Sequence, residues 1–259
     1  MKKLKMVMIM FCLVGLIMGL SMRAAQAENK AKMSKTKLML VATDSSTVTL
    51  TIQGVPFATG AIANYITPPG NEPKSFANHI YVWQTTANQV PWAKTPAGNT
   101  AVNTDSSTST QKVGFDFEQK GYIMGYAVAP TPQAVCATVF MPANKQTDPT
   151  AWEYSKLTME VVYHGTNLVQ VKYGGLAGYT PQTNKNWIGI WNGGTVPYSG
   201  QDPIKTVTIS SDTPNGYAII EDIKLLIGNT YSLGYFMVDL PSGRTSLAAT
   251  ASFSVGASR

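Results

Sequence analysis

GYIMGY at residues 121–126 and TYSLGY at residues 230–235 repeat one pattern of aromatic, small and aliphatic side chains. Trp83 and Trp191 lie 108 residues apart, and Tyr122 and Tyr231 lie 109 apart. Matching segments follow in the same order along the chain: 46–54 with 167–175, 79–83 with 187–191, 90–92 with 196–198, and 134–140 with 246–252. Because self-similarity at a fixed step indicates repeated structural units, the sequence predicts two copies of one unit of roughly 100 residues.

Short apolar runs within each copy alternate with polar residues and are separated by Gly, Pro, Asn and Ser clusters, a pattern typical of β-strands. Only 13% of the 259 residues are charged, which disfavours a disordered chain or a coiled coil. We therefore predict an all-β protein made of two tandem antiparallel β-sandwich domains. The expected ranges are 38–141 for the first sandwich, 142–150 for a Pro-containing linker, and 151–259 for the second sandwich.

LIGNTY at residues 226–231 resembles the corner between two strands in fibronectin type III and related immunoglobulin-like domains. This resemblance implies that Tyr231, and by the repeat Tyr122, is buried with its hydroxyl bonded to the backbone. The first copy reads FEQKGY at 117–122 and lacks the Leu. NWIGIW at 186–191 is similar to a strand of the immunoglobulin-like domains that precede purple acid phosphatases. This segment therefore resembles the noncatalytic domain and not the phosphatase itself.

Residues 1–27 combine a basic start, an apolar run over 6–20 and a small-residue end at Ala24-Ala25-Gln26-Ala27. This order predicts a secretory signal peptide cleaved before Glu28. The alternative, an uncleaved membrane anchor, is disfavoured because the apolar run is shorter than the roughly 20 residues that span a bilayer. No second run of that kind follows, so we expect a secreted or periplasmic bacterial protein without an integral membrane segment.

The net charge of +6 is concentrated at the N-terminus. The predicted signal peptide has four basic residues and no acid, and segment 28–37 has four lysines against one Glu. From residue 38 onward 12 basic residues face 13 acidic ones, a balance of −1, so the sequence predicts no nucleic-acid partner. Segment 28–37 is expected to be a basic N-terminal arm, either disordered or donated as a strand to a neighbour.

Side chains for catalysis are scarce. The only histidines are His79 and His164, one in each copy, and neither has a companion at metal-ligand spacing. Asp116 and Glu118 are expected to alternate on a strand face, where solvation explains them better than a glycosidase pair does. We predict no enzyme activity, no catalytic residue, no metal and no cofactor. Cys136, the only cysteine after the signal peptide, is expected to be a small core residue.

Aromatic residues suggest binding instead. Trp92 and Tyr198 each follow a Val-Pro pair in loops rich in amide and hydroxyl side chains, and such rings can stack on a sugar or anchor a protein. The predicted ligand-binding residues are Trp92, Tyr198, Asn192 and Gln89. An equally weighted alternative is that the two rings close the ends of the core. The tryptophans at 83 and 191 are expected to fill the two sandwich cores.

The sequence therefore favours an exported, noncatalytic protein that binds a glycan or cell-surface ligand. The alternative is a structural or assembly protein, such as a surface, fibre or pilus-type subunit or a two-domain periplasmic chaperone, acting through edge-strand pairing. The partner expected for the binding protein is a glycan or a surface protein. Self-association into a homo-oligomer fits the structural or assembly alternative. A hydrolase is the third and least supported class.

Overall fold

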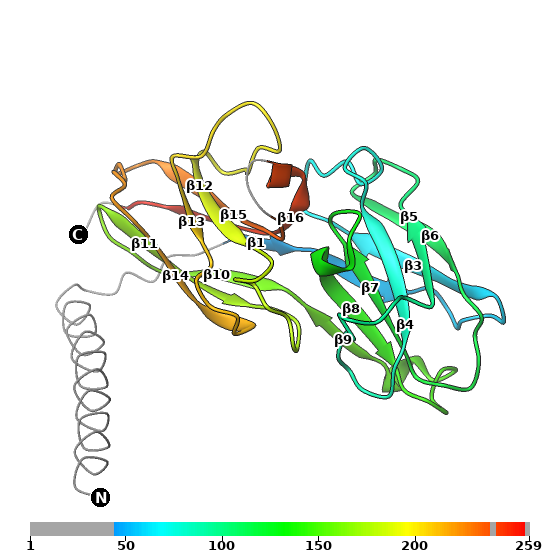
Figure 1. Cartoon of the computed structure of the whole chain (residues 1–259). Coiled ribbons are helices and arrows are strands. Elements are labelled where there is room, and N and C mark those ends of the chain that lie inside the picture. Colours follow the sequence, from blue (N-terminus) through cyan, green and yellow to red (C-terminus); the bar gives the residue numbers. More distant parts are fainter. Residues whose placement is uncertain (1–43, 239–241, 257–259) are drawn as a thin grey trace, which may run out of the picture. The chain divides into compact units, whose positions relative to one another are not determined.

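The computed structural model describes residues 44–238 and 242–256, and the strands in these ranges belong to one compact unit. The predicted signal peptide and basic arm lie outside the described residues. Sixteen strands and three short 3-10 helices, η1 (Pro132–Ala134), η2 (Pro149–Ala151) and η3 (Ser242–Ser246), make up the secondary structure of these ranges (Figure 1). All pairings between named strands are antiparallel, so the predicted all-β class is confirmed.

The first half of the chain supplies a three-stranded sheet and four strands of a five-stranded sheet. The order β2-β3-β6 comprises β2 (Thr49–Ile52), β3 (Gly60–Ile66) and β6 (Thr108–Gly114). The order β5-β4-β7-β8-β9 comprises β5 (Gly98–Ala101), β4 (His79–Gln84), β7 (Tyr122–Ala127), β8 (Val135–Met141) and β9 (Glu153–Lys156).

The second half repeats this arrangement strand for strand. The order β10-β11-β14 comprises β10 (Thr158–His164), β11 (Leu168–Gly174) and β14 (Asn215–Glu221). The order β1-β16-β15-β12-β13 comprises β1 (Asp44–Thr47), β16 (Leu247–Ser254), β15 (Thr230–Phe236), β12 (Trp187–Asn192) and β13 (Lys205–Thr208). The apolar runs of the strands are buried, as their alternation with polar residues requires.

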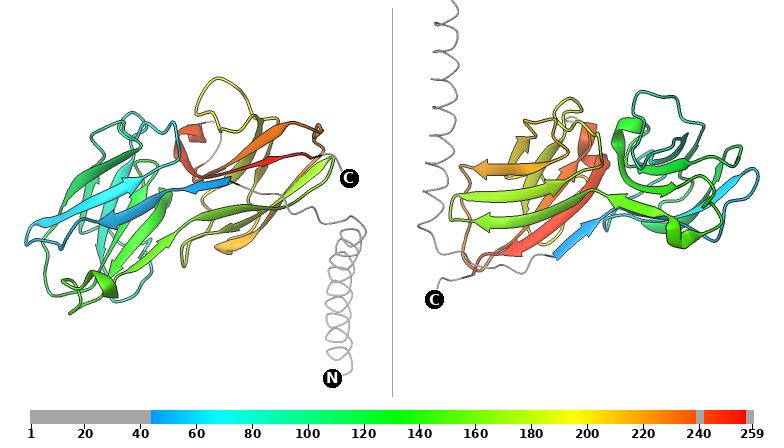
Figure 2. Two further views of the ribbon diagram at one scale, coloured as in Figure 1. Left: turned by 180° about the vertical axis from the view of Figure 1, so that it is seen from behind. Right: turned by 90° about the horizontal axis from the view of Figure 1, so that it is seen from below.

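One strand in each five-stranded sheet comes from the other half of the chain. β1 precedes the strands of the first sandwich but pairs with β16, from Asp44 opposite Ser252 to Thr47 opposite Ala249 (Figure 2). β9 precedes the strands of the second sandwich but pairs with β8. The domain limits 38–141 and 151–259 remain predictions. β1 and β9 each pair with a strand that lies in the other of these two ranges.

The tyrosine corners form in both copies. The Tyr231 hydroxyl accepts a hydrogen bond from the Leu226 backbone N–H at 2.8 Å. The Tyr122 hydroxyl donates to the Asp116 carbonyl and accepts from the Glu118 N–H, both at 3.1 Å. Both tyrosines are buried, and their role as structural residues at the start of a strand is confirmed, although the first copy lacks the Leu.

Trp83 and Trp191 are buried as predicted, at 1% and 0% exposure, but they do not lie on the face that meets the opposing sheet. Tyr126 packs on Tyr65 of the opposing sheet and pairs with Ile80, so Ile80 and Val82 face the core and Trp83 faces outward. Trp191 belongs to a separate apolar cluster with Trp187, Val196, Phe236 and Leu247. The intervening loops cover both indoles: Trp83 Nε1 donates to the Lys94 carbonyl and Trp191 Nε1 to the Gln201 carbonyl, each at 3.1 Å.

No helix within residues 44–238 and 242–256 has the length and apolar character needed to cross a bilayer.

Candidate functional site

Two crossing points connect the sandwiches. Val48 lies between β1 and β2, where its backbone N–H donates to the Ala248 carbonyl at 3.1 Å. Leu157 lies between β9 and β10, where its N–H donates to the Cys136 carbonyl at 2.7 Å. Because Cys136 and Ala248 are aligned in the sequence repeat, the two crossings are equivalent, and each strand leaves one sandwich for the other at the same place in the pattern.

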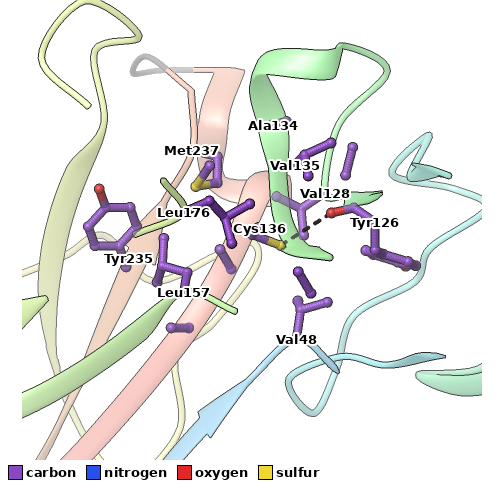
Figure 3. Close-up of a cluster of buried hydrophobic side chains, with 14 of the residues drawn as sticks. Val48, Tyr126, Val128, Ala134, Val135, Cys136, Leu157, Leu176, Tyr235 and Met237 are labelled. Carbon is purple, nitrogen blue, oxygen red and sulfur yellow. Dashed lines mark hydrogen bonds between the residues drawn. The ribbon is translucent and has the colours of Figure 1, made fainter. Parts of the chain in front are cut away.

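A buried apolar cluster surrounds these crossings. Figure 3 shows Val48, Cys136, Leu157, Leu176 and Met237 among its members. Cys136 is 1% exposed and its thiol lies 3.6 Å from the Tyr126 carbonyl, so its predicted core role is confirmed. Burial raises the pKa of this thiol far above its usual value. Cys136 is therefore an unreactive packing residue.

The aromatic residues predicted to bind ligand contact the opposite sandwich instead of lying open on their loops. The Trp92 ring packs on Tyr179, with ring centroids 5.1 Å apart. Tyr198 stacks on Phe76 at the same centroid distance of 5.1 Å. Trp92 lies in the loop after β4 and Tyr198 in the equivalent loop after β12, so the two contacts are related by the repeat. Trp92 and Tyr198 are half-buried.

Polar atoms of these two rings lack partners. Trp92 Nε1 and the Tyr198 hydroxyl are buried without a hydrogen bond among the described residues. Burial raises the pKa of the Tyr198 hydroxyl far above its usual value, so it stays protonated and can donate. An unsatisfied buried donor costs free energy, which makes both atoms points where water or a ligand oxygen would be stabilising.

The structure does not bring the four predicted binding residues together in one hollow. Gln89 is exposed and lies against Gly178, whose added Cβ would come 2.1 Å from the Gln89 amide nitrogen. Asn192 is exposed at the end of β12, opposite Tyr231. The set remains a prediction, with Trp92 and Gln89 facing the 176–179 loop and Tyr198 facing Phe76.

Two buried asparagines, which the sequence interpretation missed, connect loops to the core. The Asn78 side-chain oxygen accepts from the Tyr126 hydroxyl at 2.9 Å, and its nitrogen donates to the Val128 carbonyl at 3.2 Å. In the amide orientation that satisfies both atoms, the Asn186 oxygen accepts from the Tyr235 hydroxyl at 3.0 Å and its nitrogen donates to the Met237 carbonyl at 2.8 Å. Their spacing in the sequence could have revealed them, because Asn78 and Asn186 lie 108 residues apart, as Trp83 and Trp191 do.

The asparagine loops also join the two sandwiches. The Tyr179 hydroxyl accepts from the reoriented Asn186 nitrogen at 3.0 Å and donates to the Gln133 carbonyl at 2.9 Å, which belongs to the other half. Burial raises the pKa of the Tyr179 hydroxyl well above its usual value, which keeps this donor protonated. Tyr179 therefore connects a loop of its own sandwich, the opposite sandwich and the Trp92 ring.

An Asp in each half anchors the same loop from outside. Asp105 accepts from the Ser75 N–H at 2.7 Å and the Ser75 hydroxyl at 3.0 Å. Asp212 accepts from the Thr183 N–H and hydroxyl, both at 2.8 Å. These backbone and side-chain hydrogen bonds lower the pKa of each carboxyl below its usual value of 3.8. The structural role of both carboxylates is to hold these loops in place.

The remaining chemically active residues are separated. His79 donates a 2.9 Å hydrogen bond from Nδ1 to the Ala77 carbonyl, while His164 stacks on Phe253 with ring centroids 5.1 Å apart. The expectation that Asp116 and Glu118 alternate on a strand is wrong: both follow the end of β6, in the corner loop held by Tyr122. Across residues 44–238 and 242–256, no three His, Cys, Asp or Glu side chains lie close enough to hold a metal ion.

Open hollows flank β1. One of about 320 Å³ is lined by Ser45, Ser46, Thr47 and three residues of the 156–159 segment. Another of about 220 Å³ is lined by Asp44, Ser46 and Thr250, among others. The first two residues of β1 are exposed and the last two half-buried. β1 and β13, the two edge strands of this sheet, each have two exposed and two half-buried residues.

No family model and no curated protein matches the sequence. Among solved structures, the BSP domain of a biofilm-associated protein is 14% identical over 73% of this chain and 26% of that chain, with a TM-score of 0.24. A two-domain fibronectin type III segment from chicken tenascin is 12% identical over 76% of this chain and 94% of that chain, with a TM-score of 0.23.

This chain thus spans about a quarter of the length of the biofilm-associated chain. Its strand order and its two tyrosine corners carry the fold assignment. The chain resembles immunoglobulin-like and fibronectin type III domains at the level of the fold.

Proposed function

We propose that this chain is an exported, noncatalytic structural protein that assembles through the edges of its β-sheets. The observation that carries the proposal is the exchange of β1 and β9, because each five-stranded sheet is completed by a strand that leads into the other sandwich. Edge-strand addition of this kind supplies affinity through main-chain hydrogen bonds and needs few side-chain contacts.

The fate of the aromatic side chains supports assembly over sugar binding. A sugar ring stacks on an open aromatic face, and in this protein the faces of Trp92 and Tyr198 pack on Tyr179 and Phe76. These rings act as anchors between two protein surfaces, which is the role that large aromatic residues commonly have at interfaces.

Tandem repetition and export belong to the same proposal. Equivalent hydrogen bonds at Asn78 and Asn186, and at Asp105 and Asp212, support two copies of one sandwich. Signal peptide 1–27 would deliver the chain to the periplasm or the cell surface, where a structural protein of this class acts.

Glycan recognition is the second candidate, favoured by one observation. Trp92 Nε1 and the Tyr198 hydroxyl are buried donors without hydrogen-bond partners among the described residues. A sugar hydroxyl could satisfy either atom if the adjoining loop opened, and Asn192 offers a further amide. Such binding would require Trp92 or Tyr198 to leave its intramolecular contact.

Sedimentation velocity separates the two candidates. Protein expressed from the full sequence is measured over a wide concentration range, with and without a cell-wall polysaccharide mixture. Self-association without additive supports assembly. A monomer that shifts only with polysaccharide, and no longer shifts in Trp92→Ala and Tyr198→Ala variants, would replace assembly with glycan binding. Tyr217→Ala, at an exposed aromatic residue of β14, is the matched control.

A further inference from the structure

We propose that β1 is exchangeable and pairs with β16 of a second copy of this chain in the register it adopts within one copy. This inference rests on the proposed assembly function and names its partner and contact. Each copy then donates one strand and accepts one, so copies link head to tail in open chains or closed rings.

Covalent connectivity distinguishes β1 from its equivalent strand β9. A short connection over residues 142–152 joins β8 to β9, and Trp152 fixes it by donating from Nε1 to the Lys145 carbonyl at 3.1 Å. β9 is thereby held next to β8 in its own chain. β1 and β16 are joined within the described residues through all the other strands, so the chain between them does not hold this pair together as the 142–152 connection holds β8 and β9.

The contacts of β1 are few and polar. Its four residues read DSST, two of them are exposed, and two hollows are lined in part by its residues. The first fully buried side chain on the path is Val48, at the crossing itself. Detaching β1 therefore exposes little apolar surface, and most of what is lost is the backbone ladder to β16.

The surface that β1 leaves behind requires a new partner. Without β1, β16 becomes an edge with open backbone groups beside the buried residues Ala249 and Ala251. A β1 strand from another copy restores the same four residue pairs, from Asp44–Ser252 to Thr47–Ala249. Because the two forms contain the same contacts, protein concentration decides between them.

Disulfide trapping tests this exchange. Ser46 and Thr250 face one another across the pair and are both half-buried. Ser46→Cys and Thr250→Cys single variants are mixed at increasing concentration, oxidised, and separated on a non-reducing gel. Wild type, whose described thiol Cys136 is buried, reports background, and Thr108→Cys mixed with Ser46→Cys reports random collision. We expect a cross-linked dimer that increases with concentration only in the first mixture.

The double variant Ser46→Cys/Thr250→Cys, oxidised at low concentration, closes the pair within one chain and shows that the substituted protein folds. We expect this locked form to remain monomeric where wild type associates. The proposed exchange would be contradicted if the double variant cross-links within one chain but the two single variants never cross-link to each other. It would also be contradicted if the locked form assembles like wild type. In that second case the protein would still assemble, but through another surface. A wild type that never associates would overturn the proposed assembly function itself.

Discussion

Asn78 and Asn186 show how one buried polar residue can position a loop. Both side chains are fully buried, and each bonds a tyrosine hydroxyl and a backbone carbonyl of the neighbouring strand and turn. Buried amides are stabilising only when their donors and acceptors are paired, so each fixes the loop that precedes β4 or β12.

Replacing Asn78 by Ala should lower the free energy of unfolding by about 1–3 kcal/mol, because the Tyr126 hydroxyl and the Val128 carbonyl lose their partner while remaining buried. Urea denaturation followed by tryptophan fluorescence measures the loss. Asn99→Ala, at an exposed position of β5, is the control, with an expected change within about 0.5 kcal/mol. Equal effects of the two substitutions would contradict the role of Asn78.

His164 should make the fold sensitive to mild acid. Burial against Phe253 lowers the pKa of this imidazole below its usual value of 6.5, so the charged form is disfavoured in the folded state. The unfolded chain takes up the proton first as pH falls below about 6.5. Stability is therefore complete above that pH and is lost as pH falls through the folded-state pKa.

Urea denaturation at pH 7.5 and at pH 5 measures this loss, and His164→Phe should reduce it while keeping the ring stack. His79→Gln, which leaves His164 in place, should retain the wild-type loss. The carboxyls of Asp105 and Asp212 titrate below 3.8 and do not contribute in this range. An unchanged pH dependence in His164→Phe would show that another group is responsible.

Residue-scale prediction from the sequence succeeded where the signal is local. The tyrosine corners follow from a few adjacent residues, and their hydrogen bonds span four to six positions. Asn78 and Asn186 were missed because an Asn that follows a Pro and a Lys within a few residues is also typical of a turn, and only the tertiary fold supplies its distant partners.

At the scale of the element, β12 and β15 place a glycine opposite a glycine. Gly189 lies opposite Gly234, and the rings of Trp187 and Phe236 stack beside them with centroids 4.0 Å apart. An added Cβ at Gly189 would come within 2.5 Å of the Trp191 ring. The missing side chains make room for indole rings on the outer face of the sheet.

Gly189→Ala should therefore cost about 1–3 kcal/mol of stability, because the stacked rings have no free space into which to move. The free energy of unfolding in urea measures the loss, and near-ultraviolet circular dichroism reports whether the aromatic stack is disturbed. Gly114→Ala, where an added Cβ meets nothing within 4 Å, should show no loss. A harmless Gly189→Ala would mean that the rings do not pack closely on this strand.

The side of the sheet that each tryptophan occupies could not be predicted. β4 and β12 each contain four or more consecutive buried residues, so their pattern does not tell which alternate set faces the core. Loops 85–97 and 193–204 cover the outer faces, and that cover is a tertiary property. Strand positions were predictable from local composition, whereas strand faces were not.

At the scale of the whole molecule, the crossings join the folding of the two sandwiches. A sheet that needs a strand from the other half cannot be completed by its own half alone. The sequence repeat predicted both units, but their reciprocal pairing was not predictable, because strand alternation specifies a strand's faces and does not select the edge that it joins.

Leu157→Ala should lower the stability of both sandwiches by about 2–5 kcal/mol, since this buried side chain lies at a crossing. Differential scanning calorimetry should show one transition in wild type and one, at lower temperature, in the variant. Leu226→Ala, at a side chain that is 48% exposed, should leave the transition nearly unchanged. Two transitions, only one of them displaced, would contradict the joint unfolding of the sandwiches.

The antiparallel register of β1 and β16 also determines how the protein responds to tension. Asp44, the first described residue, lies opposite Ser252, close to the last, so a pull between the two ends of the chain loads one rung of this ladder at a time. The pair would unzip from Asp44 toward Val48 at low force and leave the strands beyond the crossing in place. A copy tethered at one end and pulled at the other would thus release β1 first.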